Sequence, residues 1–384
     1  MQFNLQSSLL TDLQISEKII FKHPSSWPNI RKNIVNGHIY LLADTRYPIG
    51  FAATVTGGYS VNINGQHYAD YNNQAQFSMA DWSAYTDSEG YDIDYPTDAS
   101  KAHIIDIYPQ ISGNNITSFS CKRVAASGEE QQGILWAHFN LSNSISLYRG
   151  FGQYNTYKNT VMEAVTAKNN LIKVSALDSC FYGTTNLSYT PVLNCQNIEM
   201  SFYGVLWNNK SLKKITLKNA VPTTLQYFAY TASALEEIKG NLDFSKVTSL
   251  GNAFVTSQKL KKLPATNFST PLTNAGNGIS YCTALEDTII NLQNCTSLNK
   301  WESYRTAGIK GLRVSNQAPF DNATAPQINI SYTGMDRQAL VTLFNDLPTV
   351  TGGQIINIVG CTGTADLTDD DKAIATDKGW TITQ

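Results

Sequence analysis

The second half of the chain repeats an apolar pattern about every 25 residues. Several repeats open with two apolar residues that enclose two polar ones, as in LKKI at 212–215 and LEEI at 235–238, and the others fit this frame with substitutions. Successive openings are separated by 25, 23, 25, 25 and 24 residues. They fall at Leu187, Leu212, Leu235, Leu260, Leu285 and Ile309. Five successive intervals that differ by no more than two residues indicate a repeat architecture.

A second apolar signal recurs within the repeats. Phe202, Phe228 and Phe254 are 26 residues apart, and each follows another apolar residue by three or four positions, which is helical spacing. Each repeat is therefore predicted to contain a short strand, a turn and a short helical piece. Because one such unit cannot bury its own apolar face, stacked units must share a core, with a parallel sheet along one side. The pattern predicts a solenoid over 171–320.

Two of the units resemble a known repeat family. LKNAVPTTLQYFAYTASALEEI at 217–238 and LDFSKVTSLGNAFVTSQKLKKL at 242–263 are similar to the leucine-rich repeats of BspA-like proteins. The segment at 335–383 resembles the terminal unit that closes such arrays. The resemblance implies a leucine-rich-repeat solenoid of the kind found in phage tail and virion proteins and in bacterial surface proteins.

The terminal segment, 321–384, is predicted to be an α/β cap. Asp336 is placed to cap a helix that ends near Asn345, and GGQIINIVG at 352–360 has the composition of a strand. Thr368 with Asp371 three residues later predicts a capping box, and WTIT at 380–383 predicts a last strand. Such a segment keeps the last repeat from exposing its core.

The first part of the chain has a different pattern. Runs rich in β-formers at 38–43, 49–57, 59–71, 103–109, 116–124 and 133–141 predict strands, and Asn64-Gly65 predicts a tight hairpin. Strands without long intervening helices favour a β-sandwich-like module over 36–141. Residues 1–35 are predicted to form an N-terminal arm, and 142–170 a linker in which TVMEAVTAKNN at 160–170 is helical. The stretch at 86–101 is predicted to be a polar loop.

Composition narrows the function classes. Charged residues make up 15% of the chain and the formal charge is −2, so we expect no nucleic-acid partner. The start, MQFNLQSSLLTDLQISEK, lacks a basic segment followed by an apolar run, and no apolar stretch is long enough for a membrane span. Neither an export signal nor membrane insertion is therefore expected. The six cysteines show no metal-ligand spacing, and we expect buried free thiols.

Candidate chemistry is sparse. All five histidines precede residue 139, which excludes a Ser-His-Asp or Cys-His site within the repeats. His103 and His138 lie in predicted strands, where a structural role is favoured over catalysis. The acidic residues between Asp87 and Asp98 lack a calcium-loop frame and are expected to form a solvated loop. We predict no catalytic residues, metal or cofactor, although the sequence leaves a glycosidase carboxylate pair open.

Tyrosines give the main binding candidates. Eleven of the twenty fall between 148 and 332, and several recur beside the predicted helical pieces. Tyrosine combines a large contact area with a hydrogen-bonding tip, which suits protein or glycan recognition. The alternative is that these rings fill space between repeats. The candidates are Tyr182, Tyr203, Tyr227, Tyr230, Tyr281 and Tyr304.

Charges at the repeat openings alternate in sign. The third position of successive repeats is Lys214, Glu237, Lys262 and Asp287. On parallel strands about 4.8 Å apart, these side chains are predicted to form a ladder of opposite charges that fixes the register of similar repeats. The array therefore presents a nearly neutral strip there, so we expect binding elsewhere.

These observations favour a non-enzymatic binding protein. Following the resemblance, we expect a phage tail-fibre or tail-associated virion protein that binds a host cell-surface protein or glycan through its repeats. Its N-terminal part would attach it to other tail proteins. The alternatives are a bacterial surface adhesin and a glycan depolymerase. Because fibre proteins are commonly trimers, the resemblance also suggests a homotrimer, but the sequence contains no coiled-coil heptads that would predict one.

Overall fold

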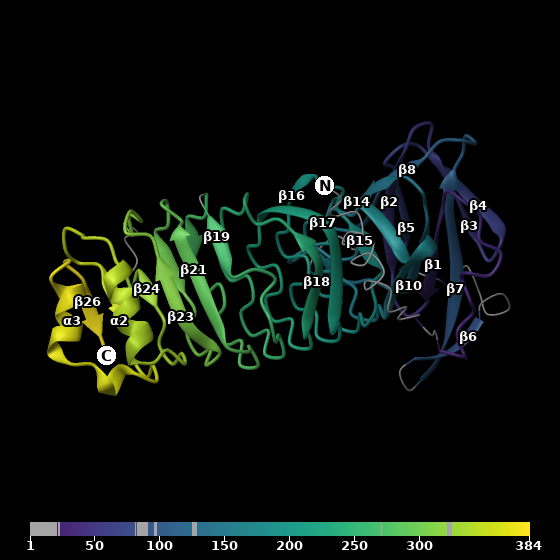
Figure 1. Cartoon of the computed structure of the whole chain (residues 1–384). Coiled ribbons are helices and arrows are strands. Elements are labelled where there is room, and N and C mark those ends of the chain that lie inside the picture. Colours follow the sequence, from purple (N-terminus) through teal and green to yellow (C-terminus); the bar gives the residue numbers. More distant parts are fainter. Residues whose placement is uncertain are drawn as a thin grey trace, which may run out of the picture.

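The protein is an elongated, mostly β molecule (Figure 1). Its computed structural model describes residues 21, 24–80, 82, 91–95, 98–124, 129–269, 271–320 and 325–384. Between residues 91 and 100, Ile93 is the one residue whose side chain is described. Strands account for 37% and helices for 7%, so the predicted mixture of α and β contains little α. A β-solenoid of about ten turns forms most of its length.

The N-terminal part contains a seven-stranded sheet. The predicted strands form, and Asn64 and Gly65 both take a positive φ in the turn between β3 and β4, as the hairpin signal requires. The sheet order is β13-β10-β1-β7-β3-β4, and β6 also pairs with β7. These strands are β1 His38–Asp44, β3 Tyr59–Ile63, β4 Gln66–Tyr71, β6 Tyr91–Tyr95, β7 Asp98–Pro109, β10 Ile134–Asn140 and β13 Ala164–Ala167.

A second, nine-stranded sheet runs from the N-terminal part into the solenoid. Its order is β16-β17-β15-β14-β11-β8-β2-β5, and β18 also pairs with β17. It crosses the predicted boundaries near residues 141 and 170 without a break. Its strands are β2 Ile49–Val55, β5 Gln76–Met79, β8 Ile116–Cys121, β11 Ser144–Ser146, β14 Leu171–Ala176, β15 Val192–Asn194, β16 Glu199–Ser201, β17 Lys214–Thr224 and β18 Glu237–Leu242.

Two further parallel sheets continue the solenoid towards the C-terminus (Figure 1). One contains β19 Asn267–Ser269, β21 Thr288–Asn294 and β23 Ile309–Val314. The other contains β20 Asn274–Ala275, β22 Lys300–Glu302, β24 Ile328–Asn329, β25 Ile355–Asn357 and β26 Thr381–Thr383. A short pair in the N-terminal half joins β9 Glu130–Gln131 to β12 Tyr157–Lys158.

The two helices of the terminal segment form where their caps predict them. Helix α2 spans Arg337–Asp346, and the Asp336 carboxylate accepts a hydrogen bond from the Ala339 N–H. Helix α3 spans Asp369–Thr376 and begins with a complete capping box between Thr368 and Asp371. The predicted strands that follow them are β25 and β26.

Two predictions of helix are wrong. Residues 160–170 contain strand β13, which pairs in parallel with β10, and the short 3-10 turn η1 Lys168–Asn170. Pairing with a buried strand outweighs the weak helix propensity of this segment. The helical pieces of the repeats are hydrogen-bonded turns, as the next subsection describes. A second 3-10 turn, η2 Thr364–Asp366, precedes α3.

The predicted loop at 86–101 also needs correction, because β6 and the start of β7 lie within it. Of the acidic cluster, Asp87 and Glu89 lie outside the described residues. Residues 1–20 of the predicted arm lie outside them as well.

One apolar core runs through the solenoid. Phenylalanine rings from successive coils contact one another within it: the Phe202 and Phe228 rings stack with centroids 6.1 Å apart, and Phe228 and Phe254 meet edge to face at 6.0 Å. All six cysteines are buried free thiols, as expected. The predicted repeat core is buried throughout, at Leu187, Leu212, Leu235, Leu260, Leu285, Ile309, Phe202, Phe228 and Phe254.

Candidate functional site

The turn side of each coil is built from short hydrogen-bonded turns that also bond to the next coil. In one coil the Phe228 N–H donates to the Leu225 carbonyl, and the Tyr230 N–H donates to the Tyr227 carbonyl. The intervening N–H groups of Tyr227 and Ala229 donate to carbonyls of the following coil, at distances of 3.0 and 2.7 Å. This alternation turns apolar residues inward and sets the remaining side chains in rows along the solenoid.

Trp207 is the centre of an aromatic cluster on these turns. Tyr154 stacks on it from an earlier coil with ring centroids 4.8 Å apart, and Tyr227 stacks on it from the next coil at 4.6 Å. Tyr182, Tyr203 and Tyr230 meet its edges at 5.4, 6.4 and 5.7 Å. Four of the six tyrosines predicted as binding residues are thus brought together around one tryptophan.

A second group lies further along the same turns. Tyr281 and Tyr304, the other two predicted tyrosines, contact each other edge to face at 5.4 Å. The Arg305 guanidinium lies over the Tyr281 ring at 5.8 Å and over the Tyr332 ring at 4.9 Å. Burial, followed by Tyr281 and then smaller contributions that include Tyr230, raises the pKa of Tyr304. The two groups are therefore within electrostatic reach of each other.

Together these residues form what we call the aromatic belt. Backbone hydrogen bonds join its coils one to the next, from the coil of Phe151 to that of Ser331. Seven steps of about 4.8 Å give a length of roughly 34 Å. The belt comprises Tyr154, Tyr182, Tyr203, Trp207, Tyr227, Tyr230, Tyr281, Tyr304, Arg305 and Tyr332.

The belt has a supporting layer and a contact layer. Both faces of Trp207 are covered by tyrosine rings, Tyr154 on one face and Tyr227 on the other, and Tyr182 is 8% exposed. In contrast, Tyr154 is 51% and Tyr332 48% exposed. Trp207 therefore positions the rings that meet solvent, while a ligand would contact the outer tyrosines.

Burial keeps the hydroxyls of Tyr182 and Tyr203 protonated at neutral pH. Burial, reinforced by the nearby Glu129 carboxylate, raises the pKa of Tyr182 to about 12. Burial also raises the pKa of Tyr203, with further contributions from Tyr227 and Tyr154. Each such hydroxyl can both donate and accept a hydrogen bond.

The sequence missed several belt residues. Trp207 follows Phe202 by five positions in its repeat, and its recurrence with Tyr182 and Tyr230 at the same stage of neighbouring units was the available signal. Tyr154 was missed because it precedes the predicted solenoid. Arg305 directly follows the candidate Tyr304, and its role depends on a cation–π contact that spacing does not reveal.

The charged repeat openings lie on the strand side. Lys214 and Glu237 are register partners on β17 and β18, with 3.9 Å between the charged atoms. Beyond this step the partners differ from those predicted: Lys262 pairs with Glu286 at 3.4 Å and Asp287 with Lys310 at 3.7 Å. The ladder changes partners because, within the described chain, no strand pairing joins β18 to residues 260–266.

The described histidines are held within the N-terminal sheet or at its surface. His103 is buried, stacks on Trp82 and lies 2.8 Å from the Asn64 amide nitrogen through Nδ1. His138 is buried with Nδ1 2.9 Å from the Thr166 hydroxyl. Among the described residues, no three histidine, cysteine or acidic side chains are grouped to hold a metal ion. Neither of the described helices is long and apolar enough to cross a membrane.

Comparison of the chain with protein-family models, curated proteins and solved structures finds no match.

Proposed function

We propose that this protein is a non-enzymatic binding protein whose aromatic belt holds a linear glycan of a host cell surface. The observation that carries the proposal is the alignment of tyrosine rings along one row of turns over several coils. Aromatic faces pack against the apolar faces of sugar rings, and tyrosine hydroxyls bond to sugar hydroxyls. A row about 34 Å long suits an extended polymer better than a compact ligand.

The resemblance of the repeats to BspA-like leucine-rich repeats supports a place on a particle or cell surface. We propose a phage tail-fibre or tail-associated virion protein, with a bacterial surface adhesin as the alternative. In this proposal the terminal segment caps the solenoid, and a sandwich-like N-terminal module attaches it to other tail proteins. Contacts between β8 and β10, where Phe119 lies 6.0 Å from Phe139, support two sheets that share a core.

The proposal is tested with fluorescently labelled full-length protein on a panel of bacterial species. We expect saturable binding to at least one species, and at least tenfold weaker binding for Tyr154→Ala combined with Tyr227→Ala. Tyr68→Ala, which removes a 38% exposed tyrosine of the N-terminal hairpin, is the matched control and should bind normally.

Reducing-end release is measured on the same cells. Binding without release supports a binding protein, whereas release of sugar ends would overturn the non-enzymatic assignment in favour of a depolymerase. Binding that is unaffected by the double substitution would remove the belt as the site.

A further inference from the structure

The parallel sheet on the strand side is interrupted after β18. Within the described chain, β18 pairs with β17 alone. The residue just before β18 still bonds to the neighbouring coil, because the Lys261 N–H donates to the Glu236 carbonyl at 3.2 Å. The adjacent coil contains Pro264, which has no N–H to offer a strand partner. One edge of β18 is therefore left without a neighbouring strand.

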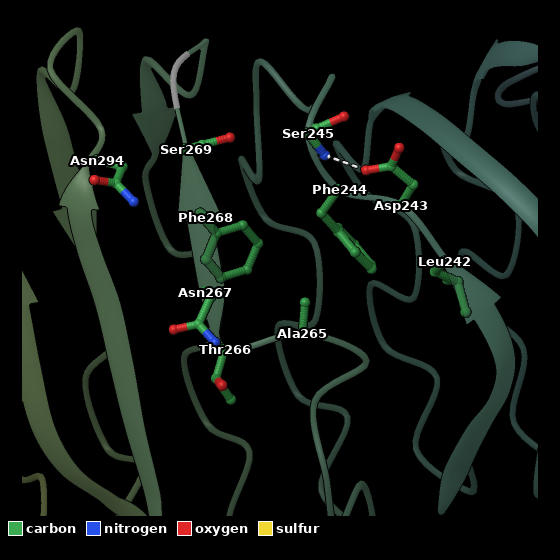
Figure 2. A pocket seen from close by; sticks show the side chains of 10 residues that line it. All are labelled: Leu242, Asp243, Phe244, Ser245, Ala265, Thr266, Asn267, Phe268, Ser269 and Asn294. Atoms are coloured by element: carbon green, nitrogen blue, oxygen red, sulfur yellow. Dashed lines mark hydrogen bonds between the residues drawn. The ribbon is translucent and has the colours of Figure 1, made fainter. Parts of the chain in front are cut away.

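Two hollows lie along this edge. One, of about 700 Å³, is lined by Glu237, Ile238 and Lys239 of β18 and by residues 261–264 opposite. The other, of about 510 Å³, begins at Leu242 and is lined by residues 265–269 opposite (Figure 2). Figure 2 shows the Phe244 ring between Leu242 and the segment that carries Ala265 and Phe268. We call these hollows together the strand-edge groove.

The walls of the groove are apolar at the bottom and basic at the rim. Ile238, Leu242, Leu263 and Ala265 are half-buried and pack on the solenoid core. Five lysines and three glutamates line the larger hollow, so positive charge is in excess. The lysines are Lys213, Lys214, Lys239, Lys261 and Lys262.

We propose that the strand-edge groove binds an extended acidic segment of a partner polypeptide, which adds to the edge of β18 as a further strand. An open edge presents N–H and C=O groups at the spacing of another polypeptide backbone, which a glycan does not match. Apolar side chains on one face of the added strand would lie over Ile238 and Leu242. Acidic side chains on the other would meet the lysines. The groove contains none of the belt residues, so this site is separate from the proposed glycan site.

The probe is a fluorescein-labelled octapeptide of alternating glutamate and valine, titrated into the full-length protein and followed by anisotropy. We expect saturable binding, together with slower hydrogen exchange of the β18 amides in the complex. Lys239→Glu combined with Lys262→Glu should weaken binding at least tenfold. Lys173→Glu, on the exposed face of β14 and away from the groove, is the matched control and should leave binding unchanged.

Circular dichroism confirms that the variants are folded before they are compared. An octapeptide of alternating lysine and valine tests the charge requirement, and dextran sulfate tests for a surface that binds any polyanion. Equal binding of both peptides, or no loss with the double reversal, would overturn the proposal. Binding of dextran sulfate without binding of the acidic peptide would also overturn it.

Discussion

Left-handed backbone at bulky residues shows how strongly neighbouring coils determine each turn. Tyr227, Thr231 and Thr256 have φ values of 57°, 58° and 58°, a region in which tyrosine and threonine are rare. Inter-coil hydrogen bonds hold them there: the Thr231 N–H donates to the Val255 carbonyl at 2.8 Å. The conformational free-energy cost of each such residue is offset by a backbone hydrogen bond to a residue about 24 positions later in the chain.

This is why the turns were missed from the sequence. Asn252 and Gly204 take the same conformation and are ordinary turn residues, but Tyr227 and Thr231 carry no local turn signal. Local propensity predicts a left-handed backbone at Asn252 and Gly204 but opposes it at Tyr227 and Thr231. At the latter two residues the conformation is fixed by contacts with the neighbouring coil, which local sequence does not reveal.

His138 makes the stability of the N-terminal sheet depend on pH. Burial, reinforced by the nearby Arg31 charge, lowers the pKa of His138 from 6.5 to about 4. As pH is lowered, His138 therefore binds a proton near pH 6.5 in the unfolded chain but only near pH 4 in the folded chain. The free energy of unfolding should fall across this window as pH is lowered, by about 3 kcal/mol in total.

Urea unfolding at pH 7 and pH 4.5 measures this contribution. His138→Gln keeps a polar partner for the Thr166 hydroxyl but does not titrate. Between pH 7 and pH 4.5, the free energy of unfolding of the variant should fall by about 2 to 3 kcal/mol less than that of the parent. Equal losses in the two proteins would show that His138 is not the titrating group.

At the scale of elements, most N-terminal strands and the capped helices were predictable, whereas β6, β13 and the repeat turns were not. Asp336 and Thr368 signal helix starts through their own side chains, so both helices were found. Apolar residues three positions apart, such as Leu225 and Phe228, fit a helix and also fit a turn closed by a bond between those two residues. Hydrogen bonds to the next coil decide in favour of the turn. These bonds cannot be read from the sequence of a single repeat.

The strand openings carry a row of charges that alternate in sign from coil to coil. Backbone hydrogen bonds of 2.8, 3.2 and 2.9 Å connect Lys213, Glu236, Lys261 and Glu286 in turn. Beside this row, Glu237 lies 3.9 Å from Lys214 and 3.5 Å from Lys239. Alternation keeps like charges apart between coils that are otherwise similar, so it opposes a slip of register.

Replacing Glu237 with lysine tests this role. Glu237→Lys would place three like charges together and should lower the melting temperature, with a cost below about 1 kcal/mol because these groups are exposed. The loss should shrink at high salt, where exposed charges are screened. Glu237→Gln is the control that removes the attraction without adding repulsion, and its melting temperature should lie between those of the parent and Glu237→Lys. An unchanged melting temperature for Glu237→Lys at low salt would contradict the account.

At the scale of the whole molecule, the 25-residue period predicted the solenoid and its core, but not its extent or its surface. The long sheet begins among the N-terminal strands β2 and β5 and continues into the coils, a pairing between segments far apart in sequence. Periodicity located the tyrosines, and stacking of the coils brought four of them around Trp207. The sheet breaks after β18, beside a coil that contains Pro264, and the repeat period does not predict this break.

The central claim is that the aromatic belt binds an extended glycan, and length dependence tests it most directly. The measurement is binding of the full-length protein to a microarray of bacterial glycans printed as oligosaccharides of increasing length. We predict retention of at least one linear series, with affinity that rises with chain length and at least a tenfold loss for the Tyr154→Ala, Tyr227→Ala double variant. Equal retention of short and long members, or equal profiles for the parent and the double variant, would contradict the claim.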